Sequence, residues 1–258
     1  MTHANLVEVF SSVQGEGPYV GASTVFVRYG VCDLRCRWCD SPHPWRAAAR
    51  CRIETKRGSA QFRELPNPVA QDDVLAALEP LEWRSHRFVS LTGGEPLLQP
   101  DAVASLARAL RGRGPRVYLE THGVATKALD AVADSVDVVS MDWKLASDVR
   151  RESDPARGEI ADFHAEHRAF LSRARRSAEV FVKVVVTPES RDDELDRMAE
   201  SIAAIDPKVP LIVQPVTPRG GTKERPSAAR LLEIAARLER RLTDVRVIPQ
   251  THPLYGAL

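Results

Sequence analysis

Three cysteines near the start of the chain have a spacing that suits metal binding. They form the sequence Cys-Asp-Leu-Arg-Cys-Arg-Trp-Cys, in which three and then two residues separate Cys32, Cys36 and Cys39. This spacing places three thiolates on one turn, where they could hold one small metal centre. A structural zinc site takes four protein ligands, and so does an ordinary ferredoxin-type four-iron cluster. The remaining cysteine, Cys51, lies twelve residues further on. Three ligands without an obvious fourth favour a [4Fe-4S] cluster with one open iron, and a structural zinc loop is the alternative.

Two stretches before the cysteines carry residues that could contact a ligand. Residues 23–30 are predicted to form a buried strand, because they are rich in β-branched and aromatic side chains, and Arg28 interrupts this run. A buried arginine needs a partner, which is either an internal carboxylate or an anionic ligand bound through two parallel hydrogen bonds. Glu16 lies between Gly15 and Gly17, which allow the backbone to turn tightly and approach a ligand. A plain loop is the alternative for this stretch.

Composition and charge exclude several classes of protein. The chain of 258 residues has 36 basic and 35 acidic residues and a net charge of +1, so nothing indicates a nucleic-acid-binding surface. It has no run of about 18 apolar residues, so no membrane-spanning helix is predicted. The N-terminus lacks the basic and apolar segments of a signal peptide, so we expect a cytoplasmic protein. Four cysteines, three of them close together, suit a reducing compartment and a metal site better than disulfides.

Strands and helices are predicted to alternate from residue 71 onward. Such alternation implies a parallel sheet with helical crossovers, although it does not separate an open sheet from a barrel. Polar residues that could bind a ligand directly follow several predicted strands, so the site is expected at the carboxyl ends of the strands. The predicted strands are 87–91, 116–119, 136–140, 179–186, 211–213 and 245–248, and the predicted helices are 71–81, 101–111, 126–133, 161–177, 192–204 and 227–242.

The stretch 43–68 interrupts this pattern. It carries three prolines, several basic residues and little hydrophobic periodicity. We therefore predict a long irregular insertion, or a lid over the site. Cys51 lies in this stretch and is predicted to have no part in the metal centre.

The cysteine spacing, the aromatic Trp38 before the last cysteine and the turn Gly93-Gly94-Glu95-Pro96 together resemble the radical S-adenosylmethionine superfamily. The resemblance implies a single α/β domain over residues 1–258, built as a partial (splayed) parallel β/α barrel of about six strands. It implies a [4Fe-4S] cluster on the three cysteines, whose open iron is chelated by the amino and carboxylate groups of S-adenosylmethionine. Residues expected to contact this cofactor are Trp38, Cys39, Asp40, Gly93, Gly94, Glu95, Asp142, Trp143, Lys144, Gln214, Pro215, Val216 and Thr217.

The chain as a whole is similar to the 7-carboxy-7-deazaguanine synthases. The matching pieces are residues 12–17, 26–30, 39–41, 92–96, 120–123 and 249–252. The resemblance implies a carbon–nitrogen lyase that converts 6-carboxy-5,6,7,8-tetrahydropterin to 7-carboxy-7-deazaguanine with release of ammonia, in queuosine biosynthesis. A 5′-deoxyadenosyl radical would take the hydrogen from C6 of the pterin, and the ring would then contract.

The same resemblance implies a set of ligands and partners. A magnesium ion is expected on Ser41, together with a one-electron donor such as flavodoxin and a homodimeric assembly. Residues expected to contact the pterin are Val13, Gln14, Gly15, Glu16, Arg28, Thr92 and Leu258. Two alternatives from other functional classes are an activase that forms a glycyl radical on a partner protein, and a non-catalytic iron–sulfur or zinc module.

Overall fold

The computed structural model describes residues 2–39, 45–155, 160–219 and 221–256. One sheet of ten strands forms its centre. Seven neighbouring strands, from β14 to β3, run parallel, and β2 is antiparallel to β3. In order across the sheet the strands are β14 (Val245–Val247), β13 (Leu211–Pro215), β12 (Glu179–Val186), β10 (Val138–Asp142), β9 (Arg116–Thr121), β8 (Phe88–Gly93), β3 (Ser23–Tyr29), β2 (Leu6–Val13), β5 (Arg50–Glu54) and β6 (Phe62–Pro66).

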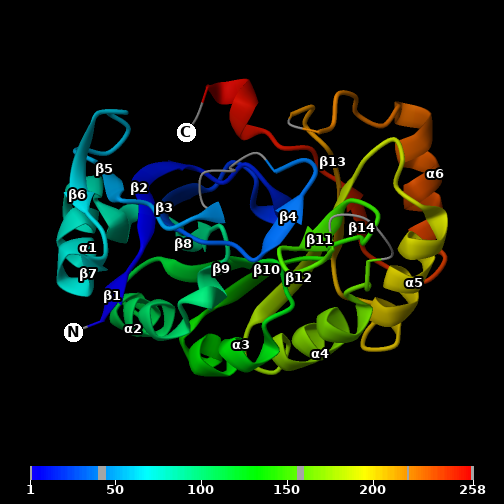
Figure 1. Ribbon diagram of the computed structural model, residues 1–258, viewed down its shortest axis with the longest axis horizontal. Coiled ribbons are helices and arrows are strands. Elements are labelled where there is room, and N and C mark those ends of the chain that lie inside the picture. Colours follow the sequence, from blue (N-terminus) through cyan, green and yellow to red (C-terminus); the bar gives the residue numbers. More distant parts are fainter. Residues whose placement is uncertain (1, 40–44, 156–159, 220, 257–258) are drawn as a thin grey trace.

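The predicted α/β fold is confirmed, and the sheet does not close on itself among the described residues, because β14 and β6 are its two unpaired ends. The helices lie outside the sheet and follow one another around it, as Figure 1 shows. They are α1 (Gln71–Leu78), α2 (Pro100–Leu110), α3 (Thr126–Val132), α4 (His164–Ala174), α5 (Asp192–Ala203) and α6 (Ala228–Glu239), with short 3-10 helices at Gly17–Tyr19, Glu79–Leu81, Trp83–Ser85, Pro96–Leu98, Ala133–Ser135 and His252–Tyr255. Within the part of the chain that the structure describes, no helix combines the length and the apolar character needed to cross a membrane.

Strand β12 shows how the parallel strands separate core from site. Side chains alternate between the two faces of a strand. Val180, Val182, Val184 and Val186 belong to the main hydrophobic core, whereas Lys183 and Val185 line a cavity on the opposite face. The β-branched residues therefore favour a strand, and those on one face pack into the core. The alternate positions, Lys183 and Val185, face the cavity.

A layer of large side chains fills the end of the sheet at which the parallel strands begin. It consists of residues near the start of five neighbouring parallel strands, which pack together as a second apolar cluster: Phe88, Tyr118, Val138, Phe181 and Ile212. The rings of Phe88 and Tyr118 meet edge to face with centroids 5.3 Å apart, and Tyr19 packs against Phe88. Since these side chains fill the amino-terminal end, the space for a ligand lies toward the carboxyl ends of the strands.

The prediction of an irregular insertion at 43–68 is wrong for residues 50–54 and 62–66. These residues form β5 and β6, which extend the sheet beyond β2. Cys51 and Ile53 point into the main core, while Arg50 and Arg52 are exposed, and Arg52 packs over the ring of Phe62. The exposed arginines alternate with the buried Cys51 and Ile53 along this strand of the edge hairpin, which made the stretch look irregular in the sequence.

Two further sheets of two strands each join segments outside the central sheet. β1 (His3–Ala4) pairs with β7 (Val69–Ala70). β4 (Leu34–Cys36), which contains part of the cysteine motif, pairs with β11 (Val149–Arg151). The second pairing places the cysteine motif above the carboxyl ends of the parallel strands, beside the loop that follows β10 (Figure 1).

Candidate active site

One cavity of about 610 Å³ lies where the parallel strands end. Strands β3, β8, β9, β10, β12 and β13 all contribute to its wall, together with the cysteine motif, the turn between β2 and β3 and the C-terminal segment. This location is the one predicted from the strand-end residues.

Most of the predicted site residues line this cavity. They are Val13, Gln14, Gly15, Glu16, Arg28, Cys32, Cys36, Trp38, Cys39, Thr92, Gly93, Gly94, Asp142, Lys144, Gln214, Val216 and Thr217. Three others, Glu95, Trp143 and Pro215, are not part of its wall. Asp40, Ser41 and Leu258 lie outside the described residues, so their predicted contacts stay predictions.

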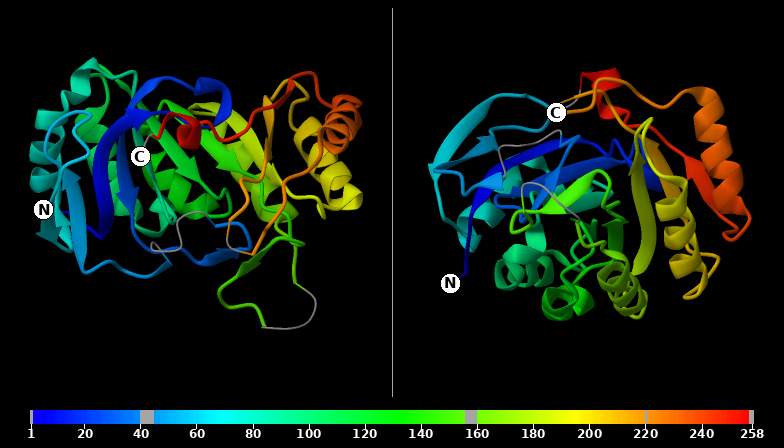
Figure 2. Two further views of the ribbon diagram at one scale, coloured as in Figure 1. Left: turned by 90° about the horizontal axis from the view of Figure 1, so that it is seen from above. Right: turned by 45° about the vertical axis from the view of Figure 1, so that its right-hand side comes forward.

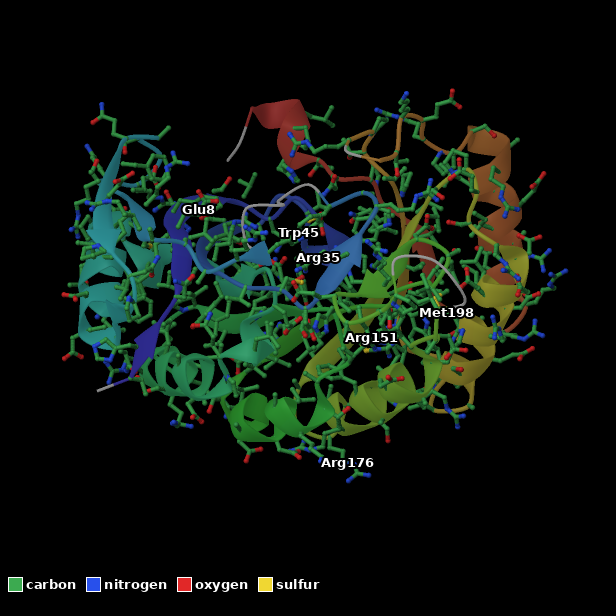
Figure 3. The ribbon with its side chains drawn as sticks, in the orientation of Figure 1. Glu8, Arg35, Trp45, Arg151, Arg176 and Met198 are labelled. Atoms are coloured by element: carbon green, nitrogen blue, oxygen red, sulfur yellow. The ribbon has the colours of Figure 1, made fainter. Side chains whose placement is uncertain are left out.

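The three cysteines lie on a turn that is held from two sides. The backbone N–H of Arg37 donates to Asp148 O at 3.0 Å, and Gly221 N donates to Arg37 O at 2.9 Å. Arg35 also lies over the ring of Trp45, 4.9 Å from its centroid (Figure 3). Loops that follow β10 and β13 therefore fix the conformation of the cysteine turn.

The donor set of this turn fits a multi-iron cluster. All three cysteines line the same cavity, but among the described residues no three His, Cys, Asp or Glu side chains converge closely enough to hold a single ion. Each thiolate of a cluster binds a different iron, so the sulfurs need to surround a cavity rather than meet at one point. Burial raises the pKa of the Cys32 thiol to about 12, and a metal centre would hold this group as a thiolate.

Two buried polar atoms in the cavity wall have no partner among the described residues. They are Nε1 of Trp38 and Oε1 of Gln214. One is a donor and the other an acceptor, and a buried polar atom without a partner is costly. A polar ligand such as S-adenosylmethionine, which has a carboxylate, an ammonium and ribose hydroxyls, would satisfy both.

The glycine turn after β8 packs tightly against the end of β3. Gly93 has φ +136°, and a Cβ there would lie 2.2 Å from Tyr29 O. Gly94 N then donates to the same carbonyl at 3.0 Å, and Glu95 N donates to Val31 O at 2.8 Å. Only glycine fits at position 93, and the turn it forms lines the cavity next to the cysteine motif.

Glu95 was predicted to contact the cofactor, but its side chain does not line the cavity. Its carboxylate is fully buried and accepts hydrogen bonds from Leu97 N at 2.8 Å, His122 N at 2.8 Å and Thr121 Oγ1 at 2.9 Å. These bonds join the glycine turn to the end of β9. The sequence could not reveal the partners Thr121 and His122, because they are more than twenty residues away in the chain and only the fold brings them to Glu95.

Trp143 and Pro215 also lie outside the cavity wall. The Trp143 ring is buried and packs against the rings of His167 and His164, with centroids 4.8 and 5.7 Å away. Pro215 is the last residue of β13, so it lies between two residues that do line the cavity, Gln214 and Val216. The alternation of side chains along an extended chain directs Pro215 away from them.

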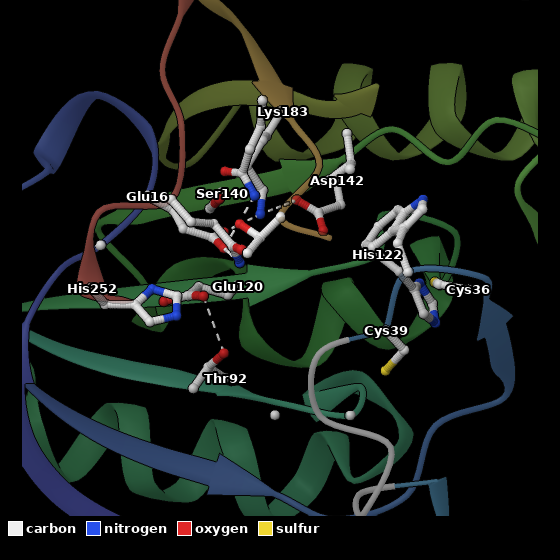
Figure 4. A pocket seen from close by; sticks show the side chains of 18 of the residues that line it. Glu16, Cys36, Cys39, Thr92, Glu120, His122, Ser140, Asp142, Lys183 and His252 are labelled. Atoms are coloured by element: carbon white, nitrogen blue, oxygen red, sulfur yellow. Dashed lines mark hydrogen bonds and ion pairs between the residues drawn. The ribbon is translucent and has the colours of Figure 1, made fainter. Parts of the chain in front are cut away.

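Four charged side chains form a connected network in the cavity (Figure 4). Lys183 forms ion pairs with Glu16 and, at 3.1 Å, with Asp142. Lys144 Nζ lies 2.7 Å from the other Asp142 oxygen and 4.8 Å from the centroid of the Trp38 ring. Burial alone would raise the pKa of Asp142, but the two ammonium groups outweigh burial and lower it.

Burial acts in the opposite sense on the two lysines. It would lower the pKa of each, but the Asp142 carboxylate raises the pKa of Lys144, and Asp142 and Glu16 together raise that of Lys183. Each of the four side chains therefore contacts a partner of opposite charge, and both lysines are ammonium groups at neutral pH.

Glu120, which was not predicted as a site residue, lies at the centre of a second group. Its carboxylate accepts hydrogen bonds from Ser90 Oγ at 2.6 Å, Thr92 Oγ1 at 3.1 Å and Gln14 Nε2 at 3.1 Å, and Figure 4 shows its contact with Thr92. Burial and the nearby Glu16 raise its pKa. The signal for this residue was its place at the end of a predicted strand.

Arg28 faces the same cavity and has an internal partner. Its Nε donates to Glu8 Oε1 at 2.9 Å, and both side chains are about one-fifth exposed, at 21% and 20%. Its two Nη atoms have no hydrogen-bond partner among the described residues. The internal salt bridge, one of the two alternatives for Arg28 in the sequence, is therefore present. The Nη atoms of the guanidinium remain available to a ligand in the cavity.

The C-terminal segment contributes to the cavity wall and lies beside the turn between β2 and β3 (Figure 2). Thr251 N donates to Gly15 O at 2.9 Å, and Gln250 Nε2 donates to Glu16 Oε1 at 2.6 Å. A Cβ at Gly15 would lie 2.6 Å from His252 Nδ1, which explains why glycine occupies that position. Lys183, Gln250 and His252 also line the cavity, although none was predicted as a site residue.

A buried histidine supports the cavity from behind. His167 Nε2 accepts a hydrogen bond from Lys144 N at 2.9 Å, and Nδ1 lies 2.9 Å from Gly123 O. Because a backbone N–H can only donate, Nε2 is unprotonated and Nδ1 carries the hydrogen. Burial lowers the pKa of His167 to about 3, so the neutral ring links the ends of β9 and β10.

This histidine predicts a specific dependence of stability on pH. Its pKa in the folded protein, about 3, is below the value of about 6.5 in an unfolded chain. Acid therefore protonates the unfolded state first, so the stabilising contribution is complete above pH 6.5 and is lost as the pH falls toward 3. Between pH 7 and pH 5 the free energy of unfolding should fall by about 2 kcal/mol more than in His167→Gln. Urea unfolding of both proteins at the two pH values measures this, and parallel pH curves would contradict it.

The comparisons with known proteins agree with this geometry. Residues 26–202 match the family model of the radical SAM superfamily. A 7-carboxy-7-deazaguanine synthase from Geobacter sulfurreducens is 41% identical over 260 residues, which cover 99% of this chain and 98% of that protein. One from Methanopyrus kandleri is 39% identical, over 97% of this chain and 92% of the relative.

The fold has a counterpart among solved structures. The crystal structure of QueE from Escherichia coli matches with a TM-score of 0.58 at 22% identity, over 97% of this chain and 95% of that one. At this identity the likeness shows the fold alone, and it agrees with the mostly parallel, unclosed sheet described above. By its sequence matches over nearly its whole length, the chain belongs to the 7-carboxy-7-deazaguanine synthase family of the radical SAM superfamily.

Proposed function

We propose that this protein converts 6-carboxy-5,6,7,8-tetrahydropterin to 7-carboxy-7-deazaguanine with release of ammonia, as a radical SAM lyase in 7-deazapurine biosynthesis. The observation that carries the proposal is that one cavity joins the cysteine turn to a group of polar side chains suited to a flat, anionic heterocycle. Family membership supplies the product, since the relatives are named for it, and the sequence resemblance implies the substrate.

The cofactor end of the cavity contains the cysteine turn and the residues beside it. When bound there, a [4Fe-4S] cluster with S-adenosylmethionine supplies a carbon-centred radical that takes a hydrogen atom from the substrate and returns one. The three cysteines would hold the cluster. Asp142 and Lys144 offer one charge of each sign to a zwitterionic amino acid, and Trp38 and Gln214 offer the unpartnered donor and acceptor described above.

The substrate end offers groups that match a pterin. A pterin ring has adjacent donors and acceptors along its edge, and Gln14, Glu16 and Glu120 present amide and carboxylate groups to the same space. The hydrogen bonds from Ser90 and Thr92 fix the orientation of Glu120 before the substrate arrives. The outer edge of Arg28 is available for the substrate carboxylate. The raised pKa of Glu120 suits a group that exchanges a proton with the ring.

Product mass tests the proposal directly. The protein would be reconstituted without oxygen with iron and sulfide, reduced, and supplied with S-adenosylmethionine and carboxytetrahydropterin. We expect a product lighter than the substrate by the mass of ammonia, formed by the protein without any protein partner. Cofactor cleavage without conversion of the pterin would favour an activase of another protein instead, and absence of cofactor cleavage would favour a non-catalytic module.

Several expectations from the sequence and from the family resemblance remain part of this proposal. They are a magnesium ion on Ser41, a one-electron donor such as flavodoxin, a homodimeric assembly, a cytoplasmic location and a single domain over the whole chain. The open polar cavity supports a small-molecule substrate, and the thiol-rich metal turn supports a reducing compartment. Omitting magnesium from the assay above, and determining the mass of the protein in solution, would test the first and third.

A further inference from the structure

Lys183 occupies an unusual place for a charged residue. It lies in the middle of β12, where its neighbours Val182 and Val184 pack into the core, and it is only 6% exposed. Its register partner on the adjacent parallel strand β10 is Asp142. Figure 4 shows its side chain reaching from the strand toward the centre of the cavity.

The two carboxylates that Lys183 contacts belong to different ends of the cavity. Glu16 comes from the turn between β2 and β3, and its other oxygen accepts hydrogen bonds from Gln250 Nε2 at 2.6 Å and Gln214 Nε2 at 3.2 Å. Asp142 lies at the end of β10, and its other oxygen is paired with Lys144, which packs over the Trp38 ring beside the cysteines. Among the described residues, Lys183 is the side chain that forms ion pairs with both.

We propose that Lys183 is a positioning residue that couples the two ligands of the cavity, so that binding of the pterin tightens the binding of S-adenosylmethionine and the reverse. This inference rests on the proposed function and adds to it. The bridge from Glu16 through Lys183 to Asp142 is a charged connection between the substrate end and the cofactor end.

The coupling follows from the cost of burying a charge. A buried ammonium must keep its carboxylate partners, because a buried charge that loses them is strongly destabilised. Lys183 remains charged at neutral pH, since its two partners raise its pKa. A ligand that fixes Glu16 therefore also fixes Lys183, which in turn holds Asp142 in place for the second ligand. The effect is equal in both directions, as for any linkage between two sites.

Binding without turnover measures this coupling. The holoprotein, reconstituted without oxygen but left unreduced, does not consume S-adenosylmethionine. Its dissociation constant for this cofactor is measured by calorimetry with and without saturating carboxytetrahydropterin, and the ratio of the two values is the coupling factor. The same ratio is measured for Lys183→Met, which removes the charge at similar volume, and for Lys144→Met, the matched control that removes the other lysine of the network.

We expect a factor of about 10 in the unchanged protein, within the range typical of linked sites. In Lys183→Met the factor should fall to about 1, whereas Lys144→Met should weaken cofactor binding and keep the factor. If Lys183 had only a structural role, its replacement would weaken cofactor binding equally with and without the pterin, so the coupling factor would not change. An unchanged ratio in Lys183→Met, or an equal loss in Lys144→Met, would overturn the inference.

A second variant tests the inference if Lys183→Met does not fold. Asp142→Asn breaks the same bridge at its other end, and its coupling factor should also fall to about 1; an unchanged factor would overturn the inference as well. The two levels of the proposal fail differently. If the unchanged protein does not bind the pterin, the proposed function falls and this inference with it. If it binds both ligands with a factor of 1, the inference alone falls.

Discussion

Replacing Cys32, Cys36 or Cys39 with alanine is expected to abolish both cluster assembly and reductive cleavage of S-adenosylmethionine. These three thiols line the cavity, and no further His, Cys, Asp or Glu in the described part of the chain joins them in a group that could replace a missing ligand. Two cysteines cannot retain a cubane whose fourth iron is reserved for the cofactor. Iron and acid-labile sulfide per chain, with the yield of methionine and 5′-deoxyadenosine under reducing conditions, measure the effect.

Cys51 provides the matched control. It is fully buried on β5 in the main core and is not part of the cavity wall. Cys51→Ala should keep the full iron content and cofactor cleavage, although it should lower the free energy of unfolding by about 1–2 kcal/mol because a packed core atom is removed. A large loss of iron in Cys51→Ala, or retention of the full cluster in any of the other three variants, would contradict the assignment of the ligands.

The parallel part of the fold could be predicted because its signals are local. The valines of β12 mark a strand without reference to any other part of the chain, and the alternation with helices implies parallel order. The strands β5 and β6 gave no such signal. In β5 Cys51 and Ile53 face the core between exposed arginines, and the strand joins the sheet by pairing with β2 more than forty residues earlier, in addition to its hairpin with β6. A non-local pairing of this kind is absent from the sequence pattern.

The site was predicted where strand order alone brings residues together. The carboxyl ends of parallel strands meet at one edge, so Thr92, Asp142 and Gln214 could be grouped in advance. Glu120 was missed although it follows a predicted strand, and Lys183 was missed because its importance depends on partners from other elements. The sequence shows a lysine within an apolar strand, but only the register with β10 and the position of the β2–β3 turn reveal its two carboxylates.

Arg28 is the residue for which the sequence left two explanations, and its replacement should have the second large effect. We expect Arg28→Ala to keep the cluster and to weaken the binding of carboxytetrahydropterin by about 100-fold or more. The side chain lines the cavity, and its Nη atoms have no partner in the described structure. Hydrogen bonds to a charged group contribute about 1.5–3 kcal/mol each, and a pair of them to the substrate carboxylate accounts for the expected loss.

Glu8 separates the ligand role from the salt bridge. Its carboxylate is the one internal partner of Arg28 in the described structure, at 2.9 Å from Nε. If Arg28 binds the substrate, Arg28→Lys should also bind poorly, because lysine lacks the two parallel donors, while Glu8→Gln, which retains an acceptor for Nε, should bind the pterin with nearly unchanged affinity. If Arg28 serves only the salt bridge, Arg28→Ala and Glu8→Gln should both lower thermal stability and leave the dissociation constant for the pterin unchanged. Measuring that constant in the unreduced holoprotein distinguishes the two roles without turnover.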